Sequence, residues 1–193
     1  MSLEDHKHYK IYKPAGVLSQ FQNNQSRRKN KRLLGELYDF HPATMAIGRL
    51  DENSEGLLLL TTNGKLSYKI LNDGTEKEYY AQLDGAITAE AIRLLQNGIG
   101  ISIHGKLYQT KPCVVKRISS PDLPPAQKTI KPSGSNTTSW ISITLTEGKF
   151  RQVRKMTSRV GFPTLRLVRV RLGQETIFKM NIAEVMQVKA FNL

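Results

Sequence analysis

Four consecutive leucines, Leu57–Leu60, lie between two polar turn segments of the chain. The segment GRLDENSEG at 48–56 precedes them, and Asn63-Gly64, a strong turn signal, follows them. A short apolar run bounded in this way is typical of a strand that is buried on both faces. The sequence therefore predicts a core strand that the chain enters directly from a polar loop.

Short strands outnumber helices in the rest of the predicted structure. The hydrophobic pattern predicts helices at 67–71 and 89–96, the second capped by Thr88 and ended by Asn97-Gly98, and a short helical segment near 33–37. A basic loop is expected at 22–32, and a long irregular loop with four prolines at 119–137. Together these segments predict an α+β fold with a mixed, mostly antiparallel central sheet and a few flanking helices. The predicted extended segments are 9–13, 17–21, 77–83, 100–104, 107–117, 140–145, 164–171 and 184–191.

An amphipathic helix is predicted from about 149 to 160. Arg151, Arg154 and Lys155 are spaced i, i+3, i+4 and share one face of it. This basic face is either a solvated surface or a place where guanidinium groups meet phosphates and a buried acid. Phe150, Val153, Met156, Thr157 and Val160 fall on the opposite side and are expected to face the core.

Basic charge is strongly concentrated along the chain. The net charge of the 193 residues is +13, and the isoelectric point is near 9.9. Eight Lys or Arg residues and no acid occur between Lys149 and Arg171. This distribution favours a nucleic acid as partner over a membrane surface, because the basic stretches lack an apolar face with aromatic anchors. A second basic cluster within the 22–32 loop consists of Arg27, Arg28, Lys29, Lys31 and Arg32.

Several classes of protein do not fit the sequence. One cysteine, Cys113, excludes an internal disulfide framework, and no apolar run is long enough to cross a bilayer. The four histidines form no zinc motif, and no glycine-rich phosphate or dinucleotide loop is present, so we expect no metal and no cofactor. No apolar signal segment opens the chain, and we expect a cytoplasmic protein.

Two positions could carry chemistry. Asp51 lies in the polar loop immediately before the leucine strand, where it is either a turn former or a nucleophile or base, with Arg49 beside it to hold a phosphate. Tyr79 and Tyr80 alternate across a strand and therefore point to opposite faces. One is expected in the core, and the other either packs as well, acts as an active-site phenol or stacks a base. The residues alone leave both pairs of alternatives open.

Three blocks of the sequence resemble the RsuA family of pseudouridine synthases. They are GRLDENSEGLLLLTTNG at 48–64, KEYYAQLDG at 77–85 and EGKFRQVRKMTSRVGFPTLRLVR at 147–169, and YKPAGVLSQF at 12–21 and TSWISITL at 138–145 are also similar. The resemblance covers nearly all of residues 8–191 and is greatest to the RluE type, which modifies large-subunit ribosomal RNA. It implies a single catalytic domain of two subdomains around a central cleft, without an N-terminal S4 domain.

The resemblance also implies roles for individual residues. Asp51 corresponds to the catalytic aspartate, Tyr79 to the active-site tyrosine that packs near the target base, and Arg154 to the basic residue paired with the aspartate. Arg49 is expected to face the RNA and Val153 to line the pocket. Because of the concentrated basic charge, Arg27, Arg28, Arg151 and Lys155 are expected to contact RNA. The chain departs from the family pattern at Phe150, Lys155, Ala81 and Thr62-Asn63, which leaves the three catalytic positions unchanged.

The implied activity is isomerisation of a uridine in large-subunit ribosomal RNA, by a monomer that needs no energy source. The uridine must leave its stack to reach a buried acid. The alternative is an RNA-binding or ribosome-assembly protein without catalytic activity, which would keep the basic stretches but would not need Asp51. DNA binding is a weaker alternative, because the sequence holds no helix-turn-helix or zinc module.

Overall fold

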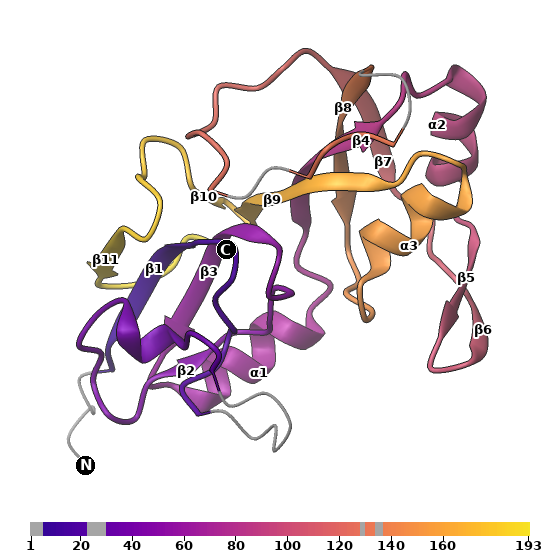
Figure 1. The fold of residues 1–193 in the computed structure, drawn as a ribbon. Coiled ribbons are helices and arrows are strands. Elements are labelled where there is room, and N and C mark those ends of the chain that lie inside the picture. Colours follow the sequence, from indigo (N-terminus) through magenta and orange to yellow (C-terminus); the bar gives the residue numbers. More distant parts are fainter. Residues whose placement is uncertain (1–5, 23–29, 128–129, 134–136) are drawn as a thin grey trace. The chain divides into compact units, whose positions relative to one another are not determined.

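The computed structural model describes residues 6–22, 30–127, 130–133 and 137–193. The chain divides into two compact units, and each is described by itself. Unit 1 comprises Met1–Thr75 and Arg171–Leu193, and unit 2 comprises Glu76–Val170. Figure 1 traces the helices and strands along the chain. The predicted RNA contacts Arg27 and Arg28 lie outside the described residues.

An antiparallel sheet forms the centre of unit 1. Strand β1 (His8–Lys13) lies between β11 (Val185–Val188) and β3 (Glu55–Thr61) and is antiparallel to both. The short strand β2 (Met45–Ala46) pairs with the end of β3. Strand β10 (Glu175–Thr176) pairs with Arg171 and Leu172, the end of β9.

All seven residues of β3 are buried, which confirms the prediction of a strand covered on both faces. Leu58 and Leu60 belong to an apolar cluster with Tyr9, Ile11 and Phe40, while Leu57 and Leu59 alternate with them and are equally inaccessible. The 3-10 turn η1 (Leu34–Glu36) adds Leu34 to this cluster. Because side chains alternate along a strand, β3 contributes apolar groups to both faces of the sheet.

Helix α1 (Gly64–Asn72) follows β3 directly and begins three residues before the predicted start. The side chain of Asn63 accepts a hydrogen bond from the backbone N–H of Leu66 at 3.0 Å and so caps the helix. The turn predicted at Asn63-Gly64 is therefore the start of the helix.

Unit 2 is built on four strands in the order β9-β4-β8-β7. Strand β4 (Lys77–Asp84) pairs antiparallel with β8 (Thr138–Leu145) over its whole length, and β8 pairs antiparallel with β7 (Val114–Ile118). Strand β9 (Thr164–Leu172) completes the sheet, its last two residues belonging to unit 1. A separate hairpin is formed by β5 (Gly100–Ile103) and β6 (Lys106–Gln109).

Helices α2 (Ala89–Gln96) and α3 (Gln152–Arg159) pack on the unit 2 core. The predicted Thr88 cap is present, since its hydroxyl accepts from the backbone N–H of Ala91 at 3.2 Å. Gly98 ends α2 with a φ of +83°, and a Cβ there would lie 2.3 Å from the carbonyl oxygen of Thr110. Glycine is therefore the residue that this turn admits. The core cluster includes Leu83, Leu95, Ile141, Ile143, Val153 and Met156.

Other predicted elements also differ from the structure. The extended segment predicted at 17–21 forms no strand, and only Val17 makes an isolated bridge, with Arg32. The strand expected at 107–117 is two strands, because the chain turns away at Thr110–Cys113, where Pro112 has no N–H for a ladder. The helix expected from 149 begins at Gln152, because Arg151 adopts a left-handed conformation with a φ of 52°. Phe150 consequently lies before the helix and is 55% exposed instead of facing the core. The mixed central sheet with few helices confirms the α+β prediction.

Candidate functional site

Asp51 lies half-buried in a tight turn that leads into β3. Its carbonyl oxygen accepts a hydrogen bond from the backbone N–H of Ser54 at 3.0 Å, which closes the turn. On the preceding side, the hydroxyl of buried Ser19 donates to the carbonyl of Leu50 at 2.9 Å and accepts from its N–H at 3.0 Å. The residue before Asp51 is thereby fixed through both of its backbone polar groups.

The following residue, Glu52, is fixed just as firmly. Its carbonyl oxygen accepts from the N–H of Gly16 at 2.8 Å, and its carboxylate pairs with the ammonium of Lys31 at 2.5 Å. The fully buried ammonium of Lys13 donates to the carbonyl oxygens of Pro14, Val17 and Glu52 at 2.8, 2.7 and 3.3 Å. These hydrogen bonds offset the cost of burying a charge and tie the end of β1 to the Asp51 turn.

Arg49 is exposed, two residues before Asp51 in the same loop. Its neighbour Gly48 has a φ of +69°, which lets the chain bend ahead of the turn. The role of Arg49 in facing the RNA stays a prediction.

Tyr79 is positioned by β4 in unit 2. It pairs with Ile143 of β8 and is partly buried against the unit 2 core cluster. Tyr80, on the other face of the strand, has a raised pKa because of its burial and the nearby Glu78 carboxylate. Of the two tyrosines it is Tyr79 that packs beside the core, with part of its ring still exposed.

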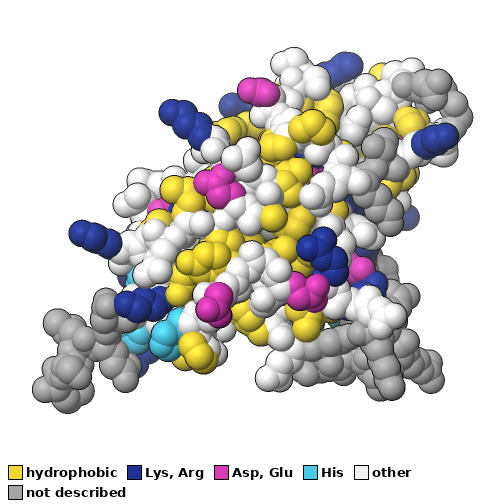
Figure 2. Space-filling view, turned by 60° about the vertical axis from the view of Figure 1, so that its left-hand side comes forward, with side chains coloured by type: hydrophobic (Ala, Val, Ile, Leu, Met, Phe, Trp, Pro, Cys, Tyr) yellow, Lys and Arg dark blue, Asp and Glu magenta, His cyan; other side chains and the backbone are white. Residues whose placement is uncertain are grey.

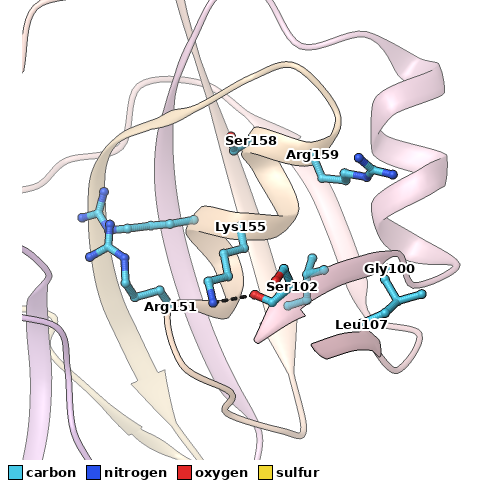
Figure 3. Close-up of a pocket in the computed structure, with 9 residues that line it drawn as sticks. Gly100, Ser102, Leu107, Arg151, Lys155, Ser158 and Arg159 are labelled. Carbon is cyan, nitrogen blue, oxygen red and sulfur yellow. Dashed lines mark hydrogen bonds between the residues drawn. The ribbon is translucent and has the colours of Figure 1, made fainter. Parts of the chain in front are cut away.

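The third site element is a groove along α3, which we call the α3 groove. Its volume is about 620 Å³, and the β5–β6 hairpin forms its other wall. The Lys155 ammonium reaches across to the carbonyl oxygen of Ser102 at 2.7 Å, whereas Arg151 and Arg159 extend to opposite sides of the helix (Figure 3). The residues that line the groove are Gly100, Ile101, Ser102, Leu107, Arg151, Arg154, Lys155, Ser158 and Arg159.

Arg154 is anchored to the strand that follows α3. Its Nη1 donates to the carbonyl oxygen of Thr164, the first residue of β9, at 3.1 Å. The hydroxyls of Thr157 and Thr164 are 2.7 Å apart, which joins α3 to β9 beside this contact. A guanidinium anchored at one nitrogen keeps its remaining N–H groups in a fixed direction.

Glu147 organises the start of α3. It accepts hydrogen bonds from the Tyr108 hydroxyl at 2.5 Å, the Lys111 N–H at 3.0 Å and the Gln152 amide at 2.6 Å. Burial by itself would raise the pKa of Glu147, but these donors and the charge of Lys149 outweigh it and hold the pKa below its usual value. The carboxylate therefore links β6 to the first residue of the helix.

The structure brings some of the predicted residues together. Arg151, Arg154 and Lys155 line one groove, as their spacing predicts, while Val153 lies in the core beneath and is only 5% exposed. Asp51 belongs to unit 1 and Arg154 to unit 2, and the pairing of the two stays a prediction.

Sequence reasoning missed Lys13, Ser19 and the hairpin wall of the groove. The spacing of Tyr9, Ile11 and Lys13 on one face of β1 is the signal that could have placed Lys13 inward. No comparable signal predicts the contact of Ser19 with Leu50 or that of Ser102 with Lys155, because each joins segments far apart in the chain.

Figure 2 shows a face of the molecule on which Lys and Arg side chains stand apart from one another, among acidic and hydrophobic groups. Basic charge does not gather there as it does in the α3 groove. Among the described residues, no three His, Cys, Asp or Glu side chains come together as metal ligands, and no helix is long and apolar enough to cross a membrane.

Comparison with known proteins identifies the family. The sequence profile of RNA pseudouridylate synthase matches residues 7–159. Ribosomal large subunit pseudouridine synthase E of Xanthomonas axonopodis pv. citri is 38% identical over 166 residues, which are 84% of each chain. The protein of the same name from Vibrio vulnificus is 36% identical over 181 residues, 92% of this chain and 73% of the relative.

A crystal structure of a pseudouridylate synthase shares the fold. It superimposes with a TM-score of 0.73 at 21% identity, covering 96% of this chain and 71% of that one. The fold, the matched profile and the similarity to these relatives agree with the resemblance of the GRLDENSEGLLLLT block. This chain belongs to the RNA pseudouridylate synthase family of isomerases.

Proposed function

We propose that this protein converts a specific uridine of large-subunit ribosomal RNA to pseudouridine, with Asp51 as the catalytic aspartate. The observation that carries the proposal is the Asp51 turn. A half-buried carboxylate stands there at the entrance to a fully buried strand, and the residues on both sides of it are fixed by hydrogen bonds. Large-subunit ribosomal RNA is proposed as the substrate because relatives with 36–38% identity are named as large-subunit pseudouridine synthases.

The reaction leaves the composition of the RNA unchanged. The bond from N1 of the uracil to C1′ of the ribose breaks, and a bond from C5 to C1′ forms. The hydrogen on C5 leaves as a proton, and N1 gains one. Asp51, in its ionised form, acts as the nucleophile or base that opens this exchange. Precise placement of one carboxylate is therefore the main structural requirement, and the Ser19 and Lys13 contacts supply it.

Residues of unit 2 receive the RNA and the base. Tyr79 offers a partly exposed ring against which the extruded uracil packs, recovering some of the cost of unstacking. Arg154 pairs with Asp51, and its anchorage on Thr164 gives the guanidinium a fixed direction for that role. Arg49, Arg151 and Lys155 neutralise phosphates of the bound strand.

Mapping the modified base tests the proposal. The protein is incubated with transcripts of large-subunit and small-subunit ribosomal RNA, and pseudouridines are located by carbodiimide adducts that stop reverse transcriptase. A stop at one uridine of the large-subunit transcript alone is the expected result. Stops only in the small-subunit transcript would overturn the target. RNA binding without any stop, on transcripts and on ribosomal precursor particles alike, would favour a non-catalytic RNA-binding protein.

A further inference from the structure

We propose that the β5–β6 hairpin and the segment before α3 form a stacking platform for an unpaired nucleotide that flanks the target uridine. The platform consists of the rings of His104 and Phe150, with Lys155 and Arg159 placed to bind the phosphates beside that nucleotide. This inference rests on the proposed function, because it assumes that the substrate is RNA. All four residues belong to unit 2.

The two rings form an exposed stack at the edge of the α3 groove. Their centroids are 5.5 Å apart, and their planes are inclined by only 20°. Phe150 is 55% exposed, and His104 is exposed as well. A nucleobase that binds here extends this stack of two rings from an outer face, as bases do on aromatic side chains in proteins that bind single strands.

The backbone holds both rings in place. His104 and Gly105 have φ values of 49° and 79°, the two successive left-handed residues of a tight hairpin turn between β5 and β6. Arg151, directly after Phe150, is also left-handed with a φ of 52°. A left-handed conformation is unfavourable for residues with a side chain and persists where the surrounding structure imposes it.

Hydrogen bonds fix the two halves of the platform to each other. Glu147 accepts from Tyr108 on β6 at 2.5 Å and from Gln152 at the start of α3 at 2.6 Å. The Gln152 side chain accepts from the N–H of Lys149 at 2.9 Å, and the Lys149 ammonium lies 4.9 Å from the centre of the Tyr108 ring. The platform is therefore ordered before any ligand arrives, which reduces the entropy cost of binding.

The charges around the rings select the occupant. The Lys155 ammonium lies 5.0 Å from the centre of the Phe150 ring and lines the groove together with Arg151, Arg154 and Arg159. Lys155 at the ring stack, together with the arginines along the groove, complements a phosphate chain with exposed bases. Paired RNA hides the faces of its bases, so the strand bound here is unpaired.

A matched pair of variants tests the platform. Phe150→Ala removes one ring, and Phe178→Ala removes a phenylalanine of almost the same exposure, 54% against 55%, from unit 1. We expect Phe150→Ala to raise both the Kd for substrate RNA and KM by about tenfold, with kcat changed less than about twofold. Phe150→Trp is expected to restore both values, and Phe178→Ala to leave them unchanged.

Two further measurements separate stacking from charge. An RNA series with single abasic nucleotides on either side of the target is expected to contain one member on which Phe150→Ala has no effect. Arg159→Ala is expected to reduce the slope of log K against log salt by about 0.7, whereas Phe150→Ala leaves the slope unchanged. His104→Asn suits the left-handed turn position, and it is expected to weaken binding as Phe150→Ala does.

The outcomes distinguish this inference from the proposed function. If the wild type forms pseudouridine but the Phe150→Ala and His104→Asn variants bind RNA as tightly as it does, the platform is overturned and the proposed function stands. Phe150-dependent RNA binding without pseudouridine formation would overturn the proposed function and leave the platform in place. Loss of affinity for an acidic peptide but not for RNA in Phe150→Ala would assign the surface to a protein partner and contradict the inference.

Discussion

The ammonium of Lys13 is completely buried and donates to the carbonyl oxygen of Glu52, the residue directly after Asp51, at 3.3 Å. The same ammonium donates to Pro14 and Val17, so one side chain joins the end of β1 to the turn before β3. Several carbonyl oxygens replace the hydration of this buried charge and so stabilise it. The placement of Asp51 thus depends on a lysine 38 positions earlier in the sequence.

Lys13→Met removes this link while keeping most of the apolar stem. Three carbonyl oxygens lose a donor, and we expect the free energy of unfolding to fall by about 3 kcal/mol. Urea denaturation followed by fluorescence or circular dichroism measures the change. Lys69→Met, at an exposed position on α1, is the control and is expected to change stability by less than about 0.5 kcal/mol.

Ser19→Ala tests whether the turn must be held for catalysis. Both hydrogen bonds to Leu50 are lost, so we expect a destabilisation of about 1–3 kcal/mol. At a temperature where the variant is fully folded, kcat is also expected to fall about tenfold or more, because the carboxylate loses its fixed position. Wild-type kcat in a folded Ser19→Ala protein would show that the hydroxyl serves stability alone. Ser67→Ala, at a buried position on α1, is the matched control.

Gly98→Ala tests the turn that ends α2. The added Cβ would lie 2.3 Å from the carbonyl oxygen of Thr110, in a backbone with a φ of +83°. Gly74→Ala meets no atom within 4 Å at a φ of +67°, so it carries the conformational cost without the clash. We expect a loss of about 1 kcal/mol for Gly74→Ala and at least about 2 kcal/mol more for Gly98→Ala. Equal melting temperatures for the two variants would contradict this account of the turn.

Glu147 gives the protein a pH dependence of stability. Its folded pKa is below the usual value of 4.5, because the Tyr108, Lys111 and Gln152 donors outweigh the effect of burial. The folded state therefore binds the proton less readily than the unfolded chain does. The ionised Glu147 carboxylate therefore stabilises the fold at any pH above the pKa that Glu147 has in the unfolded chain. This stabilisation is lost as the pH falls through the lower pKa that Glu147 has in the folded state. Urea titrations from pH 6 to about pH 3 are expected to show a steeper loss in the wild type than in Glu147→Gln.

Arg154 and Arg159 line the same groove but differ in anchorage. Arg154 donates to the Thr164 carbonyl, whereas Arg159 is exposed at the end of α3. We expect Arg154→Ala to lower kcat by about a hundredfold, and Arg159→Ala to raise KM with little change in kcat. Equal losses of kcat in the two variants would mean that the arginines of α3 bind phosphates only, and would contradict the special role of Arg154.

Local signals account for the elements that the sequence predicts well. The Leu57–Leu60 run, the Thr88 cap and the alternation at 140–145 each predict one element, and each is present, the last within the longer strand β8. The family resemblance added what local signals lack, namely the roles of Asp51, Tyr79 and Arg154, which stay predictions.

Tertiary contacts explain the elements that were not predicted. Phe150 fits the apolar face of a helix, but the left-handed Arg151 places it outside α3 and beside His104. The Glu147 contacts with Tyr108 and Gln152 join β6 to the start of α3, and periodicity along either segment carries no sign of them. The strands β2 and β10 are two residues each, too short to leave a pattern.

Release of tritium from C5-labelled uridine in large-subunit ribosomal RNA tests the central claim most directly. The hydrogen on C5 leaves only when a new bond forms at that carbon. We predict release by the wild type and none above background by Asp51→Asn, with the variant still binding the RNA and unfolding at a similar urea concentration. Tritium release by a folded Asp51→Asn protein would contradict the assignment of Asp51 as the catalytic aspartate.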